Sequence, residues 1–332
     1  MDCSGHRYAW LFPGQGSQAV GMGKDLFEAS PAAREVFARA DVALGEPLSK
    51  LILEGPEEQL TLTANAQPAL VTVSMAVLAA ARERHPTLPP PSFAAGHSLG
   101  EYSALVAAGA LSLEDAVRLV RARGRAMQDA VAPGEGAMAA IMGVETAALE
   151  EICSDVTEGR DRDEHGAPYG IVSCANFNAP GQIAIAGAAR AVARASERLS
   201  AAGGRAIPLK VSAPFHCALM APAAEALGRE LDKVEVRPLA FPVVANLDAR
   251  PNTDPARVKR LLVGQVDGAV RWEQAMRFIR AEGVTRALEI GPGKVLAGLG
   301  RRVAKDMNIL SIGDLASLDA LGDFVAPPSP AP

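Results

Sequence analysis

The stretch that decides the fold runs from residue 93 to residue 109 and reads "FAAGHSLGEYSALVAAG". It begins with a short apolar run, typical of a buried strand, and continues as an alanine-rich helical pattern. Between the two stands G-H-S-L-G, with Ser98 between Gly96 and Gly100. The glycines would leave room for a sharp strand-to-helix turn that exposes the serine hydroxyl as a nucleophile. The alternative is a serine that only caps the helix, and the spacing alone does not separate the two.

Strand and helix patterns alternate on both sides of this turn. Residues 7–12, "RYAWLF", predict a buried strand that ends at Pro13. Helical spacing follows over residues 24–44 and 65–84, and residues 286–303 predict a further strand, glycine turn and helix. This alternation predicts an α/β fold with a parallel sheet.

The order of elements changes between Pro133 and Val211. We expect a strand, a helix, two strands, a helix and a final strand, over residues 136–144, 145–155, 170–176, 182–187, 188–202 and 205–211. This βαββαβ order is that of a ferredoxin-like module. The prediction is therefore a discontinuous large domain (1–132 and 212–318), a small inserted subdomain (133–211) and a disordered proline-rich tail (319–332).

Composition narrows the classes of protein. The 332 residues are 49% hydrophobic, which is enough to form a large core. The net charge of −5 argues against a nucleic-acid-binding protein, which would normally have a basic face. The N-terminus has no long apolar stretch and no uninterrupted apolar run reaches membrane-spanning length, so we expect neither secretion nor a membrane partner. No C-x-x-C pair occurs, which argues against zinc or a disulfide framework and favours a reducing cytoplasm. The four cysteines are Cys3, Cys153, Cys174 and Cys217.

One arginine lies on the wrong face of a predicted helix. The stretch "LSLEDAVRLVRARGRAMQDAV" (111–131) predicts a helix with Ser112 as its N-cap, and Arg123 falls on its apolar stripe. A buried guanidinium must find a partner. Arg123 is therefore either half of a structural ion pair or a binding group for a ligand carboxylate.

A nucleophilic serine needs a base within hydrogen-bond reach, and His216 is the best candidate among five histidines. It follows an Ala-Pro-Phe turn and is predicted to stand at a helix N-terminus, where the helix dipole would keep the ring neutral. A capping or core histidine is the alternative. His97 is expected to shape the serine turn, and His165 lies in a charged loop.

The base also needs an orienting acceptor, which is either a carboxylate or a backbone carbonyl. The main-chain N–H of Leu99 is a natural oxyanion donor, and residues 13–16 would supply a second unless they form an ordinary turn. "GPGK" at 291–294 is predicted as a turn, because Val295 stands where a phosphate loop needs Ser or Thr. The candidate carboxylates are Asp248, Asp267 and Glu289.

Several motifs together resemble one family. "LFPGQGSQ" (11–18), "GHSLGEYSALVAAGALSLEDAVRLVRARGRAM" (96–127) and "VSAPFHCALM" (211–220) occur in order, and "GAMAAIMG", "ANFNAPGQIAIAG" and "EIGPGKVLAGL" accompany them. Over residues 7–312 the chain resembles the malonyl-CoA:acyl carrier protein transacylases. The resemblance implies a hydrolase-like α/β domain with a ferredoxin-like insertion.

The resemblance also implies roles for single residues. Ser98 matches the residue that carries the acyl group, His216 the general base, and Arg123 the group that binds the free carboxylate of malonate. The remaining matches surround these three. They are Gln15 and Leu99 as oxyanion donors, Gln265 as the main-chain carbonyl that orients the histidine, and Asn176 and Asn178 at the border of the cleft.

The function that the resemblance implies is ping-pong transfer of malonyl from malonyl-CoA to the phosphopantetheine thiol of acyl carrier protein, supplying fatty acid synthesis. No metal or other cofactor is expected, and a monomer is the default. The alternatives are an acyltransferase of a polyketide or polyunsaturated lipid synthase, a hydrolase of acyl carrier proteins, and a non-catalytic carrier-binding subunit.

Overall fold

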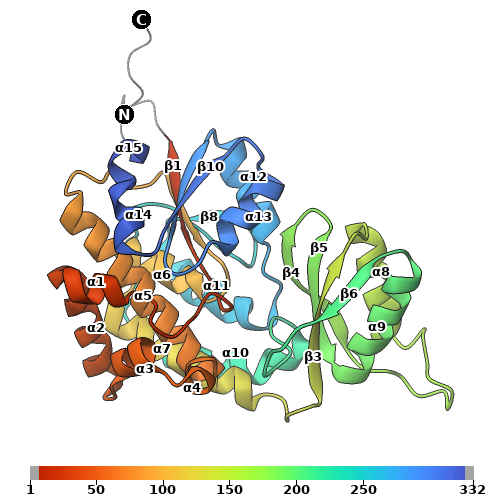
Figure 1. Cartoon of the computed structure of the whole chain (residues 1–332). Helices are drawn as coiled ribbons and strands as arrows, with labels where there is room; N and C mark the ends of the chain where they lie inside the picture. Colours follow the sequence, from red (N-terminus) through yellow and green to blue (C-terminus); the bar gives the residue numbers. More distant parts are fainter. Residues whose placement is uncertain (1–6, 326–332) are drawn as a thin grey trace, which may run out of the picture.

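The computed structural model describes residues 7–325 and contains two sheets side by side (Figure 1). The larger has the strand order β10-β9-β1-β2-β7-β8 and is parallel except for β8, which pairs antiparallel with β7. The predicted α/β class with a parallel sheet is confirmed. The strands are β1 (Tyr8–Phe12), β2 (Phe93–Gly96), β7 (Val243–Val244), β8 (Pro251–Asn252), β9 (Arg286–Ile290) and β10 (Asn308–Ile312).

Strand β1 lies in the middle of this sheet, and all five of its residues are buried. Such a continuous apolar run is typical of a parallel strand covered on both faces. The register pairs Phe12 with Gly96, so β1 and β2 end at the same edge. The loop that follows β1 and the serine turn that follows β2 therefore meet there, and His97 N donates a hydrogen bond to Phe12 O (3.0 Å).

The predicted helix over residues 24–44 is two helices. Ser30 is extended, and its side chain accepts a hydrogen bond from the amide of Ala33, so it caps a helix that starts at Pro31. A proline is favoured at the first helical position and keeps the residue before it out of helical geometry. The helices before the small sheet are α1 (Lys24–Ala29), α2 (Pro31–Leu44), α3 (Leu48–Glu54), α4 (Glu57–Leu60), α5 (Thr63–Arg84), α6 (Gly100–Ala107) and α7 (Leu113–Asp129).

Among the described residues, helix α5 is long and apolar enough to cross a membrane by length and composition alone, although polar residues interrupt its apolar sequence. Its 22 residues include an 18-residue stretch with a mean hydropathy of 1.4. Within the fold, however, 83% of that apolar stretch is buried. Helix α5 packs against α7 and α2, so its apolar character is that of a central core helix.

The smaller sheet is antiparallel throughout, with the order β4-β5-β3-β6. Its elements follow the predicted βαββαβ sequence, and their apolar residues form a cluster of their own. The domain boundaries stay a prediction. The elements are β3 (Gly136–Met142), α8 (Thr146–Thr157), β4 (Val172–Ala179), β5 (Gln182–Ala188), α9 (Ala189–Ala201) and β6 (Arg205–Pro208).

Backbone hydrogen bonds join strand β4 of the small sheet to the segment between α11 (Pro255–Asp267) and α12 (Trp272–Ala281). Val270, in this segment, donates its N–H to Ala175 O and accepts from Phe177 N, each at 2.9 Å. The small sheet is thus attached to the large part of the molecule along β4.

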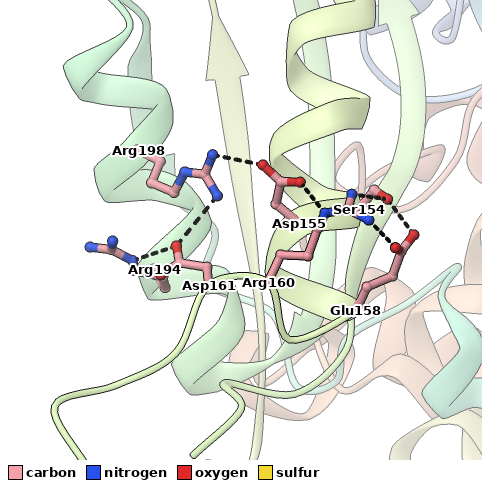
Figure 2. A network of polar contacts seen from close by, with 7 residues as sticks. All are labelled: Ser154, Asp155, Glu158, Arg160, Asp161, Arg194 and Arg198. Carbon is pink, nitrogen blue, oxygen red and sulfur yellow. Dashed lines mark hydrogen bonds and ion pairs between the residues drawn. The ribbon is translucent and has the colours of Figure 1, made fainter. Parts of the chain in front are cut away.

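Charged side chains tie the loop after α8 to helix α9 (Figure 2). Arg198 bonds to Asp155 (2.9 Å) and Asp161 (3.4 Å), and Arg160 bonds to Asp155 (2.6 Å). Arg194 also pairs with Asp161 (2.8 Å). The loop lies at the surface as predicted, and each exposed pair contributes little to stability alone.

The predicted disordered tail began too early. Residues Leu321–Val325 form helix α15, in which Leu321 is fully buried and the Phe324 ring packs under the Arg286 guanidinium at 4.6 Å. Burial of Leu321 and the packing of Phe324 stabilise a helix here, although the sequence after it is rich in proline. The rest of the predicted tail, residues 326–332, lies outside the described residues. The remaining helices are η1 (Ala218–Met220), α10 (Ala221–Leu231), α11, α12 (Trp272–Ala281), α13 (Val295–Val303) and α14 (Leu315–Asp319).

Candidate active site

The turn between β2 and α6 places Ser98 in the left-handed region, with φ 51°. This conformation is uncommon for residues other than glycine. Gly96 and Gly100 make it possible, because a Cβ on Gly96 would lie 1.9 Å from the Gly100 carbonyl carbon, and one on Gly100 2.3 Å from Phe12 O. Helix α6 has no side-chain cap. Ser98 is therefore held in a sharp turn and does not serve as a helix cap.

His216 meets the serine from the other side of the cavity. Its Nε2 lies 2.8 Å from Ser98 Oγ, and its Nδ1 lies 2.8 Å from the main-chain oxygen of Gln265. A carbonyl only accepts, so Nδ1–H donates to Gln265 and Nε2 is left to accept the serine proton. Of the two open alternatives for the orienting group, the structure has the backbone carbonyl.

The predicted helix start at His216 was wrong. His216 has a left-handed φ of 61°, and the chain enters helical geometry only at η1, from Ala218. Pro214 and the tight turn before His216 hold the chain away from a helix at that point. The ring stays neutral for another reason: burial, followed by the positive charge of Arg123, lowers the pKa of His216 to about 3.

The three carboxylates considered for the orienting role lie elsewhere. Asp248 pairs with Arg257 (3.1 Å), and in residues 7–325 no hydrogen bond joins Asp248, Asp267 or Glu289 to His216. Glu289 accepts from the first amides of helix α13, Leu296 N (2.8 Å) and Ala297 N (3.0 Å). Because these amides are occupied, the "GPGK" segment is a turn and not a phosphate loop, as predicted.

Arg123 is 1% exposed, yet its guanidinium faces only neutral groups. Nη1 donates to Gln67 Oε1 (2.8 Å), while Nη2 donates to Gln265 Oε1 (3.0 Å) and Ser98 Oγ (3.1 Å). Within the described chain Arg123 forms no ion pair, and its Nε has no hydrogen-bond partner. The structural ion-pair alternative is therefore excluded. A buried positive charge without a counter-ion is suited to an anionic ligand.

Arg121, two residues earlier on the same helix, shows the contrast. Its guanidinium forms an ion pair with Glu46 and a hydrogen bond with Asn65, and it is 8% exposed. Helix α7 thus carries one buried arginine with a protein counter-ion and one, Arg123, without.

Two residues of the site were missed by sequence reasoning. Glu101 is 2% exposed, and its Oε2 accepts from Gln265 Nε2 (2.7 Å) and Asn246 N (2.9 Å). Asn246 follows β7, and its Oδ1 accepts the N–H of Ser98 (2.7 Å). Burial raises the pKa of Glu101 to about 7. Glu101 could have been found from the sequence, because it is a lone charged residue in an apolar, alanine-rich helix. No feature of the sequence marked Asn246 as part of the site.

A cavity of about 550 Å³ opens over Ser98, His216 and Arg123. Gln15 and Asn176 line it as well. The predicted site residues Leu99 and Gln265 are buried behind the reacting groups. Asn178 does not line the cavity, but its Oδ1 contacts Nε2 of His97 (2.8 Å), which does. In residues 7–325, no group of three or more His, Cys, Asp or Glu side chains is placed to hold a metal ion.

Comparison with known proteins identifies the family. The model of the acyl transferase domain family matches residues 9–320. The malonyl CoA-acyl carrier protein transacylases of Bacillus subtilis (strain 168) and Escherichia coli (strain K12) are 49% and 43% identical, covering 94% and 95% of this chain and 95% and 98% of theirs.

Solved structures are equally similar. The acyl-carrier-protein-S-malonyltransferase of Bartonella henselae matches with a TM-score of 0.89 and 50% identity, over 95% of this chain and 98% of that one. A malonyl-transacylase solved with its type II PKS acyl-carrier protein matches with a TM-score of 0.88 and 43% identity, over the same shares. The chain belongs to the acyl transferase family, and within it to the malonyl CoA-acyl carrier protein transacylases.

Proposed function

We propose that this chain transfers a malonyl group from malonyl-CoA to the phosphopantetheine thiol of an acyl carrier protein. The observation that carries the proposal is the buried guanidinium of Arg123, 3.1 Å from the Ser98 hydroxyl and without a protein counter-ion. In a malonyl thioester the reacting carbonyl carbon is two bonds from the carbon of the free carboxylate, through a single CH₂ group. One substrate can therefore present the carbonyl to Ser98 and the carboxylate to Arg123.

The first half-reaction loads the enzyme. Ser98 Oγ attacks the thioester carbonyl while Nε2 of His216 takes its proton, at the 2.8 Å distance observed. The main-chain N–H groups of Leu99 and Gln15 are proposed to hold the oxyanion. The carbon–sulfur bond then breaks, and the coenzyme A thiolate leaves with the proton from His216. The product is malonyl-Ser98.

The second half-reaction reverses these steps with another thiol. His216 takes the proton of the phosphopantetheine thiol, the sulfur attacks malonyl-Ser98, and the ester bond breaks as Ser98 regains its proton. One thioester is exchanged for another, so the overall reaction is nearly balanced. These steps use the chain's own groups and the two thioesters, and we propose no metal or redox cofactor.

Arg123 would also select the acyl group. A guanidinium binds a carboxylate through two parallel hydrogen bonds, which a neutral acetyl group cannot replace. A site built around a charged partner discriminates strongly against an analogue that leaves it unpaired. We therefore propose malonyl as the preferred acyl group and Asn176, on the cavity wall, as a border of the thioester path.

Fatty acid synthesis is the proposed pathway, and a polyketide pathway is the second candidate, because one relative was solved with a type II PKS carrier. Carrier preference in parallel assays separates the two. We also propose a monomer, tested by its mass in solution, and a cytoplasmic location. The free thiols of Cys153, Cys174 and Cys217 support a reducing compartment.

Intact-protein mass spectrometry after brief mixing with malonyl-CoA or acetyl-CoA tests the proposal, with Ser98→Ala as the control. We expect a malonyl adduct that requires Ser98 and disappears when holo acyl carrier protein is added. Release of free malonate at the rate of coenzyme A release would instead identify a hydrolase. No adduct and no turnover would leave a carrier-binding subunit.

A further inference from the structure

One buried carboxylate near the cavity has no place in the proposed steps. Glu101 is 2% exposed and does not line the cavity, yet it contacts two residues that hold the reacting groups. We infer that Glu101 is a positioning residue that fixes the Gln265 side-chain amide, so that Arg123 stays directed at Ser98. The inference rests on the proposed function and adds to it the origin of acyl selectivity.

The Gln265 amide lies between the carboxylate and the guanidinium. Its Nε2 donates to Glu101 Oε2 (2.7 Å) and to the main-chain oxygen of Ser98 (3.1 Å). Its Oε1 accepts from Nη2 of Arg123 (3.0 Å). The contacts with Glu101 and Arg123 are buried and the contact with Ser98 is partly buried. Reversing the amide would exchange a donor for an acceptor at each of them.

Only one orientation of this amide satisfies its neighbours. A guanidinium offers donors alone, and Oε2 of Glu101 is the acceptor for two N–H groups. Rotating the amide by 180° would bring its NH₂ group against Arg123 and its oxygen against Glu101, with both hydrogen bonds lost. Glu101, through the shorter of the two hydrogen bonds that Nε2 donates, therefore fixes with the Ser98 carbonyl which end of Gln265 faces Arg123. The Oε1 atom of Gln265 then remains the acceptor for Nη2 of Arg123, and this holds Nη2 beside the Ser98 hydroxyl.

The same carboxylate oxygen also supports the nucleophile turn. Oε2 accepts the main-chain N–H of Asn246 (2.9 Å). The Asn246 side chain accepts from Ser98 N (2.7 Å) and donates to Gly96 O (2.6 Å), so it spans the strained turn. Glu101 thus connects the serine turn and the Arg123 contacts through two different neighbours and touches no reacting atom itself.

The two connections predict different losses. Weakening the Asn246 connection affects every acyl group, because the serine turn is common to all of them. Weakening the Gln265 connection affects malonyl more than acetyl, because only malonyl uses Arg123. The ratio of malonyl to acetyl loading therefore reports the proposed role, and a general loss of folding does not change that ratio.

The test measures kcat/KM for loading of Ser98 with malonyl-CoA and with acetyl-CoA. In Glu101→Leu, which has no acceptor, we expect the malonyl/acetyl ratio to fall at least about tenfold. In Glu101→Gln, whose side-chain oxygen can accept both hydrogen bonds, we expect a ratio within about threefold of the original. The matched controls are Glu289→Leu and Glu289→Gln, since Glu289 is equally buried but caps α13 away from the cavity. Neither control should change the ratio.

A second variant keeps the test decisive if Glu101→Leu does not fold. Gln265→Met retains the main-chain carbonyl on His216 but lacks the amide, and it should lower the ratio by the same factor.

The outcomes are distinguishable from failure of the proposed function. If the unaltered enzyme forms no malonyl-Ser98, the proposed function itself fails. If it does, but Glu101→Leu or Gln265→Met lowers malonyl and acetyl loading equally, the positioning role is refuted. Loss of selectivity in Glu101→Gln equal to that in Glu101→Leu would also refute it.

Discussion

Replacing Arg123 with methionine should convert a malonyl-selective site into an unselective one. Methionine fills a similar length of the buried space but carries no charge. In the protein, Nη1 and Nη2 are held 2.8 Å and 3.0 Å from neutral amide oxygens, so within residues 7–325 no carboxylate contacts the guanidinium, and Glu101 acts on it only from behind Gln265. The malonyl carboxylate would supply the missing charge in a buried place.

The magnitude follows from that burial. Removing one partner of a buried, hydrogen-bonded ion pair costs about 3–5 kcal/mol, or on the order of 100-fold or more in kcat/KM for malonyl-CoA. Acetyl-CoA has no carboxylate to lose, and its rate reports only the lost Nη2 contact to Ser98 Oγ. We expect a change of threefold or less for acetyl-CoA.

The assay follows transfer to holo acyl carrier protein with each thioester in separate reactions. Arg121→Met is the matched control, because Arg121 lies on the same helix and is buried, but pairs with Glu46. It should lower stability without altering the malonyl/acetyl ratio. Equal losses for both thioesters in Arg123→Met would show that Arg123 supports the fold or the serine and does not recognise the carboxylate.

Three further results are expected. Because the pKa of His216 is lowered to about 3, its ring stays neutral in acid, and single-turnover loading in a Glu101→Gln background should not fall between pH 7 and pH 5; a fall with a midpoint near 6.5 would contradict this. Burial raises the pKa of Glu101 from 4.5 to about 7. Its contribution to the free energy of unfolding is therefore complete below pH 4.5 and is lost as the pH rises through about 7. Urea unfolding should show a loss of roughly 3 kcal/mol over that range, and Glu101→Gln should not show it. Gly96→Ala would place a Cβ 1.9 Å from the Gly100 backbone, so thermal unfolding should show a loss of several kcal/mol, larger than for Gly298→Ala, where the added Cβ meets nothing.

Local patterns were sufficient for much of the fold. Alternating strand and helix patterns predicted the parallel sheet, and the βαββαβ order predicted the small one. Ser112 caps α7 as expected, with its side chain accepting from Asp115 N. These features depend on residues close in sequence, where turn chemistry and periodicity operate.

Contacts between distant segments could not be derived in the same way. Glu101 and Asn246 are 145 residues apart and are joined by a single hydrogen bond. The position of Arg123 on an apolar stripe predicted burial, but whether it met a carboxylate depended on which side chains arrived from α5 and α11. His216 was the best candidate base from its position and also matched the base of the family, and it does lie beside the serine. The local reason offered for its neutrality, a helix start, was wrong.

The backbone contacts of Val270 with Ala175 and Phe177 bear on how substrates reach the cavity. They fasten strand β4 beside the cavity, where Asn176 forms part of the wall, so opening the space by swinging the small sheet outward would break main-chain pairing. A ping-pong enzyme receives the acyl group from coenzyme A and passes it to acyl carrier protein through the same opening, although the two differ greatly in size. In this fold only the thin pantetheine arm would enter the cavity, and the rest of either carrier would stay outside. An opening of fixed size would then suffice without a moving lid. It would exclude the nucleotide of coenzyme A and the acyl carrier protein alike, and so accept the pantetheine arm of either one.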